Sequence, residues 1–191
     1  MAKRVFFSFH YQDVVDFRAN VVRNHWVTKP DRQEAGFFDA SIWESSKKTG
    51  PIALKRLING GLQNTSVTAV LVGSQTYARE WVRYEIVKSI EVGNKVFGVH
   101  INQIPDKNKV VKPHGANPFD FLGLTFSADG KKLHMLEYNG NQWVPYNHIP
   151  TIDVTWAVQR TYWGTSHKLS NFYRLFCWQG DNGYQNFSNW V

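Results

Sequence analysis

The chain has 191 residues, of which 42% are hydrophobic and 15% aromatic, enough to bury the core of one domain with an elaboration. Its net charge of +7 comes from scattered basic residues without a nucleic-acid-binding motif, so nucleic acid is not indicated, whereas an anionic small molecule fits. No apolar stretch approaches membrane-spanning length and the amino terminus is too polar for a signal peptide, so we expect a cytoplasmic protein without membrane contact. The lone Cys177 receives no function.

The first predicted elements are a strand and a helix. The run RVFFSF at residues 4–9 is short, apolar and aromatic-rich, as buried strands are. Apolar residues then recur at helical spacing over residues 14–26, and Asp13 is placed to cap the amino terminus of this helix. A strand followed by a helix indicates an α/β unit.

A polar segment separates this unit from a second predicted helix. The stretch ASIWESSKKTG at residues 40–50 is expected to form a loop around Trp43. Pro51 is expected to begin an amphipathic helix, and Gly60 and Gly61 are expected to end it.

Two further apolar runs predict buried strands, at residues 66–73 and 94–101, with the helix that carries Glu85 between them. Apolar strands that alternate with helices of about ten to fifteen residues predict an α/β fold with a parallel sheet flanked by helices. In such folds ligands bind outside the carboxyl ends of the strands.

The pattern changes after residue 104, so we divide the chain into an α/β core at 1–104 and a C-terminal elaboration at 105–191 packed on the same domain. The segment KPHGANP is expected to be a surface connection, and residues 133–146 are expected to form a hairpin around Asn139-Gly140. The tail is rich in aromatic residues, which are expected to seal a core or cover a sheet edge, with a sugar- or protein-binding face as the alternative. These residues are Trp156, Tyr162, Trp163, Phe172, Tyr173, Phe176, Trp178 and Trp190.

Candidate site residues lie in three segments that follow predicted strands. They are Ser8, Phe9 and His10, then Asp39, Ser41 and Trp43, then Trp81 and Glu85. Each alone has an ordinary explanation as a turn, surface or loop residue, and their expected convergence on one crevice supports a site. Glu85 is expected at the edge of a buried helix face, where it is either a solvated salt-bridge residue or a catalytic carboxylate at the lip of a cleft.

Several other chemistries lack their sequence motifs. The chain has no Cys-x-x-Cys, His-Glu-x-x-His, P-loop or Gly-x-Ser-x-Gly motif, so neither a metal site nor a hydrolase elbow is predicted.

The order of the motifs resembles TIR domains. RVFFSFHYQD is similar to their first strand and loop, and VLVGSQTYAREWVRYEI is similar to the segment in which a strand leads to Trp and, three residues later, the catalytic Glu. The resemblance covers about residues 4–101 and is closest to the TIR-like ThsB family of the bacterial Thoeris anti-phage system, which also shares the chain's length and aromatic-rich tail. It implies a flavodoxin-like sheet. Val82 replaces the more common Cys and is expected to point into the apolar stripe.

The resemblance implies that NAD+ is the substrate and that no cofactor is needed. TIR enzymes of this kind cleave the nicotinamide–ribose bond, and members similar to this family make cyclic ADP-ribose isomers as diffusible messengers for a ThsA-type NADase effector. Glu85 matches the catalytic residue and Trp81 its aromatic companion, while the loops at residues 8–10 and 39–43 correspond to substrate-contacting regions. Self-association of the active form and a phage-derived trigger are also implied.

A non-catalytic TIR-type interaction module is the alternative. In that case Glu85 is a surface residue that forms salt bridges with Arg79 or Arg83.

Overall fold

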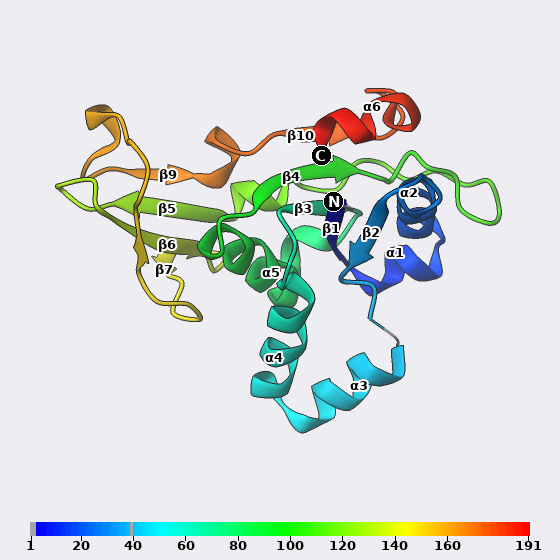
Figure 1. Cartoon of the computed structure of the whole chain (residues 1–191), viewed down its shortest axis with the longest axis horizontal. Helices are drawn as coiled ribbons and strands as arrows, with labels where there is room; N and C mark the ends of the chain where they lie inside the picture. The colour runs from blue at the N-terminus through cyan, green and yellow to red at the C-terminus, as the bar shows by residue number, and fades with distance from the viewer. Residues whose placement is uncertain (1–2, 39) are drawn as a thin grey trace.

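A five-stranded parallel sheet forms the centre of the molecule (Figure 1). The computed structural model describes residues 3–38 and 40–191, and of residues 40–44 it describes the backbone only. The strand order is β10-β4-β3-β1-β2, and neighbouring strands are parallel. The strands are β1 (Lys3–Phe9), β2 (Arg32–Ala35), β3 (Val67–Val72), β4 (Lys95–His100) and β10 (Leu175–Cys177). The predicted α/β fold and its three predicted strands are confirmed.

Helices cover both faces of this sheet, which explains why its central strands are apolar along their length. The helices of the chain are α1 (Tyr11–Val15), α2 (Arg18–Val27), α3 (Ala40–Thr49), α4 (Pro51–Leu62), α5 (Glu80–Glu91) and α6 (Gly183–Trp190), with short 3-10 helices η1 (Thr76–Ala78), η2 (Pro118–Asp120), η3 (Arg160–Tyr162) and η4 (Leu169–Asn171). Helix α3 lies beside α4, away from the sheet (Figure 1). Val5 and Phe7 of β1 pack in one cluster with α2 and α6, whereas Phe6 packs against α4 on the opposite face. The strand therefore alternates between two buried layers.

A second, antiparallel sheet packs against α5 (Figure 1). Its strands are β5 (Leu122–Phe126), β6 (Lys132–Tyr138), β7 (Trp143–Pro145), β8 (Ile152–Asp153) and β9 (Ser166–Lys168). Their order is β7-β6-β5-β9, and β8 pairs with β6. The predicted hairpin is confirmed, because Tyr138 pairs with Trp143 across a turn in which Gly140 has a φ of +103°.

The aromatic tail closes the parallel sheet at one edge. β10 pairs with β4, so the segments on the two sides of residue 104 share one sheet. Trp178 and Trp190 are buried in the cluster that joins α6 to α2, which confirms the core-sealing role for these two residues. Trp156 and Phe172 are exposed instead.

The helix predicted over residues 14–26 is divided in two. Phe17 adopts a left-handed conformation with a φ of +65°, and the capping role predicted for Asp13 is wrong because Asp13 is buried within α1. The interactions of the buried Arg18 stabilise the chain at this break. Arg18 donates to the backbone oxygens of Ile104 and Val110 and pairs with Asp16. Ile104 and Val110 are distant from Arg18 in sequence, and Asp16 is not at helical spacing from it. Helical periodicity therefore does not reveal these interactions.

Two other local predictions are wrong. The expected loop at residues 40–50 contains helix α3, whose described side chains are polar and largely exposed, so it lacks an apolar periodicity. Helix α4 begins at Pro51 as predicted but continues through Gly60 and Gly61. A β-carbon at Gly61 would lie 2.9 Å from the ring of Phe38, so this glycine permits close packing rather than ending the helix.

Two glycine substitutions are expected to change stability in opposite directions. Gly60→Ala adds a β-carbon where no atom lies within 4 Å, so better helix propensity should stabilise the fold by about 0.5–1 kcal/mol. Gly73→Ala should destabilise it, because the new atom would lie 2.1 Å from a carboxyl oxygen of Asp13. Thermal unfolding measures both effects, and shifts of the same sign would contradict this packing.

Candidate active site

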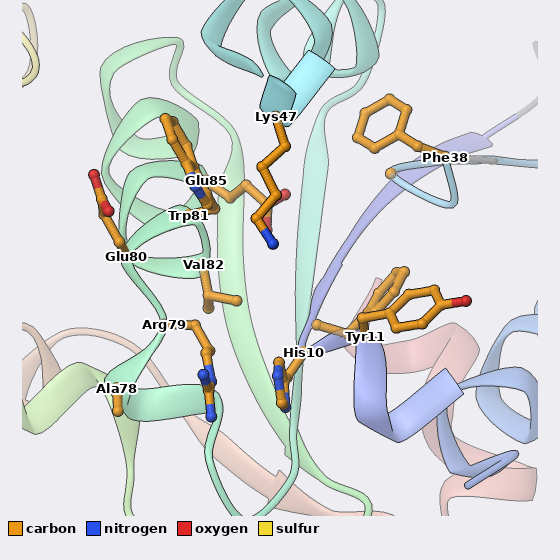
Figure 2. A pocket seen from close by; sticks show the side chains of 12 residues that line it. His10, Tyr11, Phe38, Lys47, Ala78, Arg79, Glu80, Trp81, Val82 and Glu85 are labelled. Atoms are coloured by element: carbon orange, nitrogen blue, oxygen red, sulfur yellow. The ribbon is translucent and has the colours of Figure 1, made fainter. Parts of the chain in front are cut away.

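The main cavity lies at the carboxyl edge of the parallel sheet. The chain leaves β1 for β2 on one side, while β3 lies on the other, so the strand order reverses beside β1 and a crevice is expected there. The cavity has a volume of about 530 Å³, within the usual size of ligand pockets. Its lining residues are Phe9, His10, Tyr11, Gly36, Phe38, Lys47, Ala78, Arg79, Glu80, Trp81, Val82 and Glu85 (Figure 2).

Glu85 is held at the base of this cavity by a residue of the first strand. Ser8 lies two positions after Phe6, so strand alternation turns it toward the same face, on which α5 packs. The Ser8 hydroxyl donates to Oε2 of Glu85 at 2.6 Å. Glu85 is only 5% exposed, so the expectation of a position at the edge of the buried face is wrong.

A second buried contact fixes α5 one turn later. The Ser89 hydroxyl donates to the backbone oxygen of Glu85 at 2.6 Å and accepts from the Thr68 hydroxyl at 2.7 Å. Thr68 belongs to β3, so α5 is tied to two neighbouring strands of the sheet. These bonds set the rotation of the helix and therefore the direction of the Glu85 side chain.

The surface salt-bridge interpretation of Glu85 is wrong. The Arg83 guanidinium instead pairs with Glu137 and donates to the backbone oxygens of Tyr77 and Tyr138. In the described part of the chain, Glu85 has Ser8 as its side-chain hydrogen-bond partner and no cation within salt-bridge distance.

Burial controls the protonation of Glu85. Loss of solvation raises the pKa of its carboxyl to about 8, and the hydrogen bond from Ser8 opposes this rise. With this pKa the carboxyl is mainly neutral at pH 7. A cation bound beside it would favour the carboxylate and lower the pKa.

Basic side chains enter the cavity from three different segments. Figure 2 shows Arg79 and His10 across from each other and Lys47 reaching from α3 toward the middle of the cavity. Burial, together with the positive charge of Arg79, lowers the pKa of His10, so its imidazole is neutral at pH 7. The charged lining therefore consists of the acids Glu80 and Glu85 and the cations Lys47 and Arg79, which suits a ligand that carries both charges.

Aromatic rings form much of the remaining wall. The ring centroids of Phe9 and Phe37 are 4.3 Å apart, and Trp81 packs edge-on against Tyr84 at 6.1 Å. Phe38, which follows β2, faces the cavity from the opposite side to Trp81 (Figure 2). Such surfaces hold planar heterocyclic rings and exclude water.

The structure brings together five of the predicted site residues. Phe9, His10, Trp81 and Glu85 line the cavity, and Ser8 contacts Glu85. Asp39 lies outside the described residues, as do the side chains of Ser41 and Trp43.

Three of the lining residues that were not predicted lie on or next to elements that the sequence did not reveal. Gly36 and Phe38 follow the unrecognised strand β2, and Lys47 lies on the unrecognised helix α3. Gly36 has a φ of +91°, and its missing side chain allows close approach to the backbone of Phe7. The Gly-Phe-Phe sequence at residues 36–38 could have indicated this part of the site, because it places a flexible turn and two aromatic rings directly after the short segment that forms β2.

No metal or membrane feature accompanies the site in the described residues. Within residues 3–38 and 40–191, no three His, Cys, Asp or Glu side chains are grouped to hold a metal ion. No helix of this described part combines the length and hydropathy needed to cross a bilayer.

Comparisons with known proteins identify the family of the chain. The family described as "Thoeris protein ThsB, TIR-like domain" matches residues 6–106, which contain the end of β1, all of β2, β3 and β4, and the residues that line the main cavity. The chain belongs to this family. A relative from Bacillus cereus (strain MSX-D12) is 59% identical over 191 residues, which cover the whole of both chains. That ThsB relative is named "Putative cyclic ADP-D-ribose synthase ThsB1".

The buried acid of this ThsB-family protein predicts a pH-dependent stability. The folded-state pKa of Glu85 is about 8, whereas an unfolded Glu has a pKa of about 4.3, so the folded state retains a proton between these values. The protonated Glu85 carboxyl therefore contributes its full stability to the fold below about pH 4.3, and this contribution to the free energy of unfolding is lost as the pH rises toward 8.

Glu85→Gln remains neutral at every pH, so its stability relative to the wild type should rise with pH. The increase should reach up to about 1.4 kcal/mol per pH unit, or about 3–6 °C in melting temperature. Thermal unfolding of both proteins from pH 5 to 8 tests this. A constant difference between them would show that Glu85 ionises at an ordinary pH.

Proposed function

We propose that this protein consumes NAD+, cleaves its nicotinamide–ribose bond and closes the remaining ADP-ribose into a cyclic isomer. The observation that carries the proposal is the Ser8-anchored Glu85 at the base of a cavity that also contains Arg79 and Lys47. The full-length identity to a protein named as a cyclic ADP-D-ribose synthase supports the same activity.

One carboxylate is sufficient for the cleavage step. The nicotinamide of NAD+ is cationic and leaves as a neutral molecule with the electron pair of the broken C–N bond, so no general acid is required. Positive charge develops on the ribose, and a carboxylate close to it stabilises the transition state. The low exposure of Glu85 strengthens this interaction because little water screens it.

Substrate binding supplies the ionised form of Glu85. The carboxyl is mainly neutral at pH 7 when no cation lies beside it, and the nicotinamide cation favours its carboxylate. The released proton passes to solvent, while the Ser8 hydroxyl keeps its hydrogen bond to Oε2 and holds the orientation. The acid is therefore charged when a cation is present to interact with it.

The other lining residues bind the rest of the dinucleotide in this proposal. Arg79 and Lys47 attract the pyrophosphate, and rings such as Trp81 and Phe38 hold the heterocycles. When water is excluded, an adenine nitrogen or a ribose hydroxyl of the same molecule attacks C1′ of the nicotinamide ribose. Such positioning lowers a barrier by roughly 7–11 kcal/mol, and attack by water gives linear ADP-ribose instead.

The proposal extends to the role of the product. The cyclic isomer is a diffusible messenger that activates a ThsA-type NADase effector in anti-phage defence, without stable binding between the two proteins. Self-association and a phage-derived trigger increase activity by raising the population of the competent state. The family match supports the link to the Thoeris system, and the effector, the trigger and self-association are this proposal's extension of that link.

Glu85→Gln is expected to abolish nicotinamide release. The substitution removes the charge while preserving the shape of the side chain, so turnover should fall by at least about 100-fold. The fold should remain intact, as measured by thermal unfolding and circular dichroism. Glu91→Gln is the matched control on the same helix, because Glu91 pairs with Lys88 and does not line the cavity. Unchanged turnover in folded Glu85→Gln would favour the non-catalytic interaction module.

Arg79→Ala is expected to weaken NAD+ binding. Loss of a charged contact to the pyrophosphate should raise KM about tenfold at low ionic strength, with a smaller change in kcat. Arg56→Ala removes the same charge from an exposed position on α4 that does not line the cavity. Steady-state kinetics compare the two variants, and an equal rise in KM would indicate a general charge effect instead of a local contact.

A further inference from the structure

A second cavity adjoins the main one. It has a volume of about 290 Å³ and is lined by Ala78, Glu80, Arg83, Glu137, Tyr146 and His148. Ala78 and Glu80 line both cavities, so the wall between them is the segment that also carries Arg79. Figure 2 shows Glu80 on the side of α5 away from His10. The opposite wall comes from the antiparallel sheet, which lies beyond the family match at residues 6–106.

The second cavity contains a buried hydroxyl without a hydrogen-bond partner. Tyr146 is only 4% exposed, and its hydroxyl has no partner among the described residues. Buried polar groups are normally paired, so an unpaired hydroxyl on a residue that lines a cavity indicates a place for a ligand atom. Burial and the nearby charges of Glu137 and Glu80 raise the pKa of Tyr146, so its hydroxyl remains protonated and can donate.

The charged side chains of this cavity are largely balanced. Arg83 is already held by Glu137 and by the backbone oxygens of Tyr77 and Tyr138. The His148 ring contacts the Lys55 ammonium at 3.3 Å, next to the Tyr146 ring. Because two carboxylates accompany Arg83, the cavity does not favour a phosphate group.

The available donors and acceptors match a sugar diol. Tyr146 can donate one hydrogen bond, and the carboxylates of Glu80 and Glu137 can accept others. A ligand that satisfies both kinds of group must itself accept and donate, which each hydroxyl of a ribose does. Acidic side chains bind ribose hydroxyls in the same way in dinucleotide-binding folds.

We propose that the second cavity binds the ribosyl group of an adenosine, with Tyr146 donating to one hydroxyl and a lining carboxylate accepting from another. The assignment of this adenosine to NAD+ rests on the proposed function. With the nicotinamide ribose at Glu85 and the pyrophosphate at Arg79, the chain of the dinucleotide crosses the shared wall of Ala78 and Glu80. Anchoring the adenosine end keeps the two halves of the substrate folded, which favours ring closure over attack by water.

Adenosine itself is the probe, because its binding requires no turnover. Calorimetric titration measures its affinity for the whole wild-type protein, for Tyr146→Phe and for Tyr173→Phe. The second variant is the matched control, since Tyr173 is a largely buried tyrosine that lines neither cavity. The same titrations with 2′,3′-dideoxyadenosine test the role of the hydroxyls.

Tyr146→Phe should weaken adenosine binding about 2- to 12-fold, the effect of one hydrogen bond, while Tyr173→Phe leaves it unchanged. The two variants and the wild type should bind dideoxyadenosine with equal, weaker affinity. Because the Tyr146 hydroxyl has no protein partner, Tyr146→Phe should melt at an unchanged or higher temperature.

The proposal is overturned if adenosine does not bind, if Tyr146→Phe retains wild-type affinity, or if dideoxyadenosine binds as tightly as adenosine. Nicotinamide release from NAD+ is measured in parallel with the wild-type protein. Normal adenosine binding without nicotinamide release contradicts the proposed function and leaves the ribosyl site standing. Nicotinamide release with unchanged adenosine affinity in Tyr146→Phe contradicts the ribosyl site alone.

Discussion

The hydrogen bond between Ser8 and Glu85 is the constraint on which the geometry of the site depends. It joins β1 to α5 across 77 residues of sequence at a distance of 2.6 Å. A carboxyl with 5% exposure is costly to bury without a partner, so this bond restricts where α5 can sit. Apolar contacts alone tolerate small rotations of a helix, whereas hydrogen bonds at Glu85 and Ser89, one turn apart, do not.

The burial that positions Glu85 also couples its charge to ligand binding. An acid whose pKa is about 8 is mainly neutral at pH 7, so the folded protein avoids an uncompensated buried charge. Any cation that binds beside it must favour the carboxylate, and by linkage the carboxylate favours the cation to the same degree. The preference for a cationic group is thus a property of the buried environment, and an exposed glutamate would have far less of it.

The helices and strands that could be predicted are those marked by a pattern of neighbouring residues. β1, β3, β4 and α5 combine apolar runs or helical periodicity with clear ends, and the strand-end rule together with the TIR resemblance located Ser8 and Glu85. The short polar strand β2 and the polar helix α3 lack such a signal, so the cavity residues Phe38 and Lys47 were missed.

The remaining errors have tertiary causes. The break before α2 depends on bonds from Arg18 to backbone oxygens of residues 104 and 110, and Gly61 remains helical because it packs on Phe38. The burial of Glu85 depends on Ser8, which is far away in sequence and whose hydroxyl is equally typical of a turn. Local pattern does not contain these contacts, although strand alternation correctly placed Ser8 and Phe6 on one face once β1 was known.

Helix α5 connects the two sheets because neighbouring positions on it face different partners. Successive residues of an α-helix are rotated by about 100°, so Arg83 and Glu85 point roughly 200° apart. Glu85 is held by the parallel sheet through Ser8, and Arg83 is held by β6 of the antiparallel sheet through Glu137. A displacement of the antiparallel sheet relative to α5 would therefore strain the Arg83 contacts or rotate Glu85 away from Ser8. The C-terminal elaboration thus acts on the geometry of the buried acid through the helix that carries it.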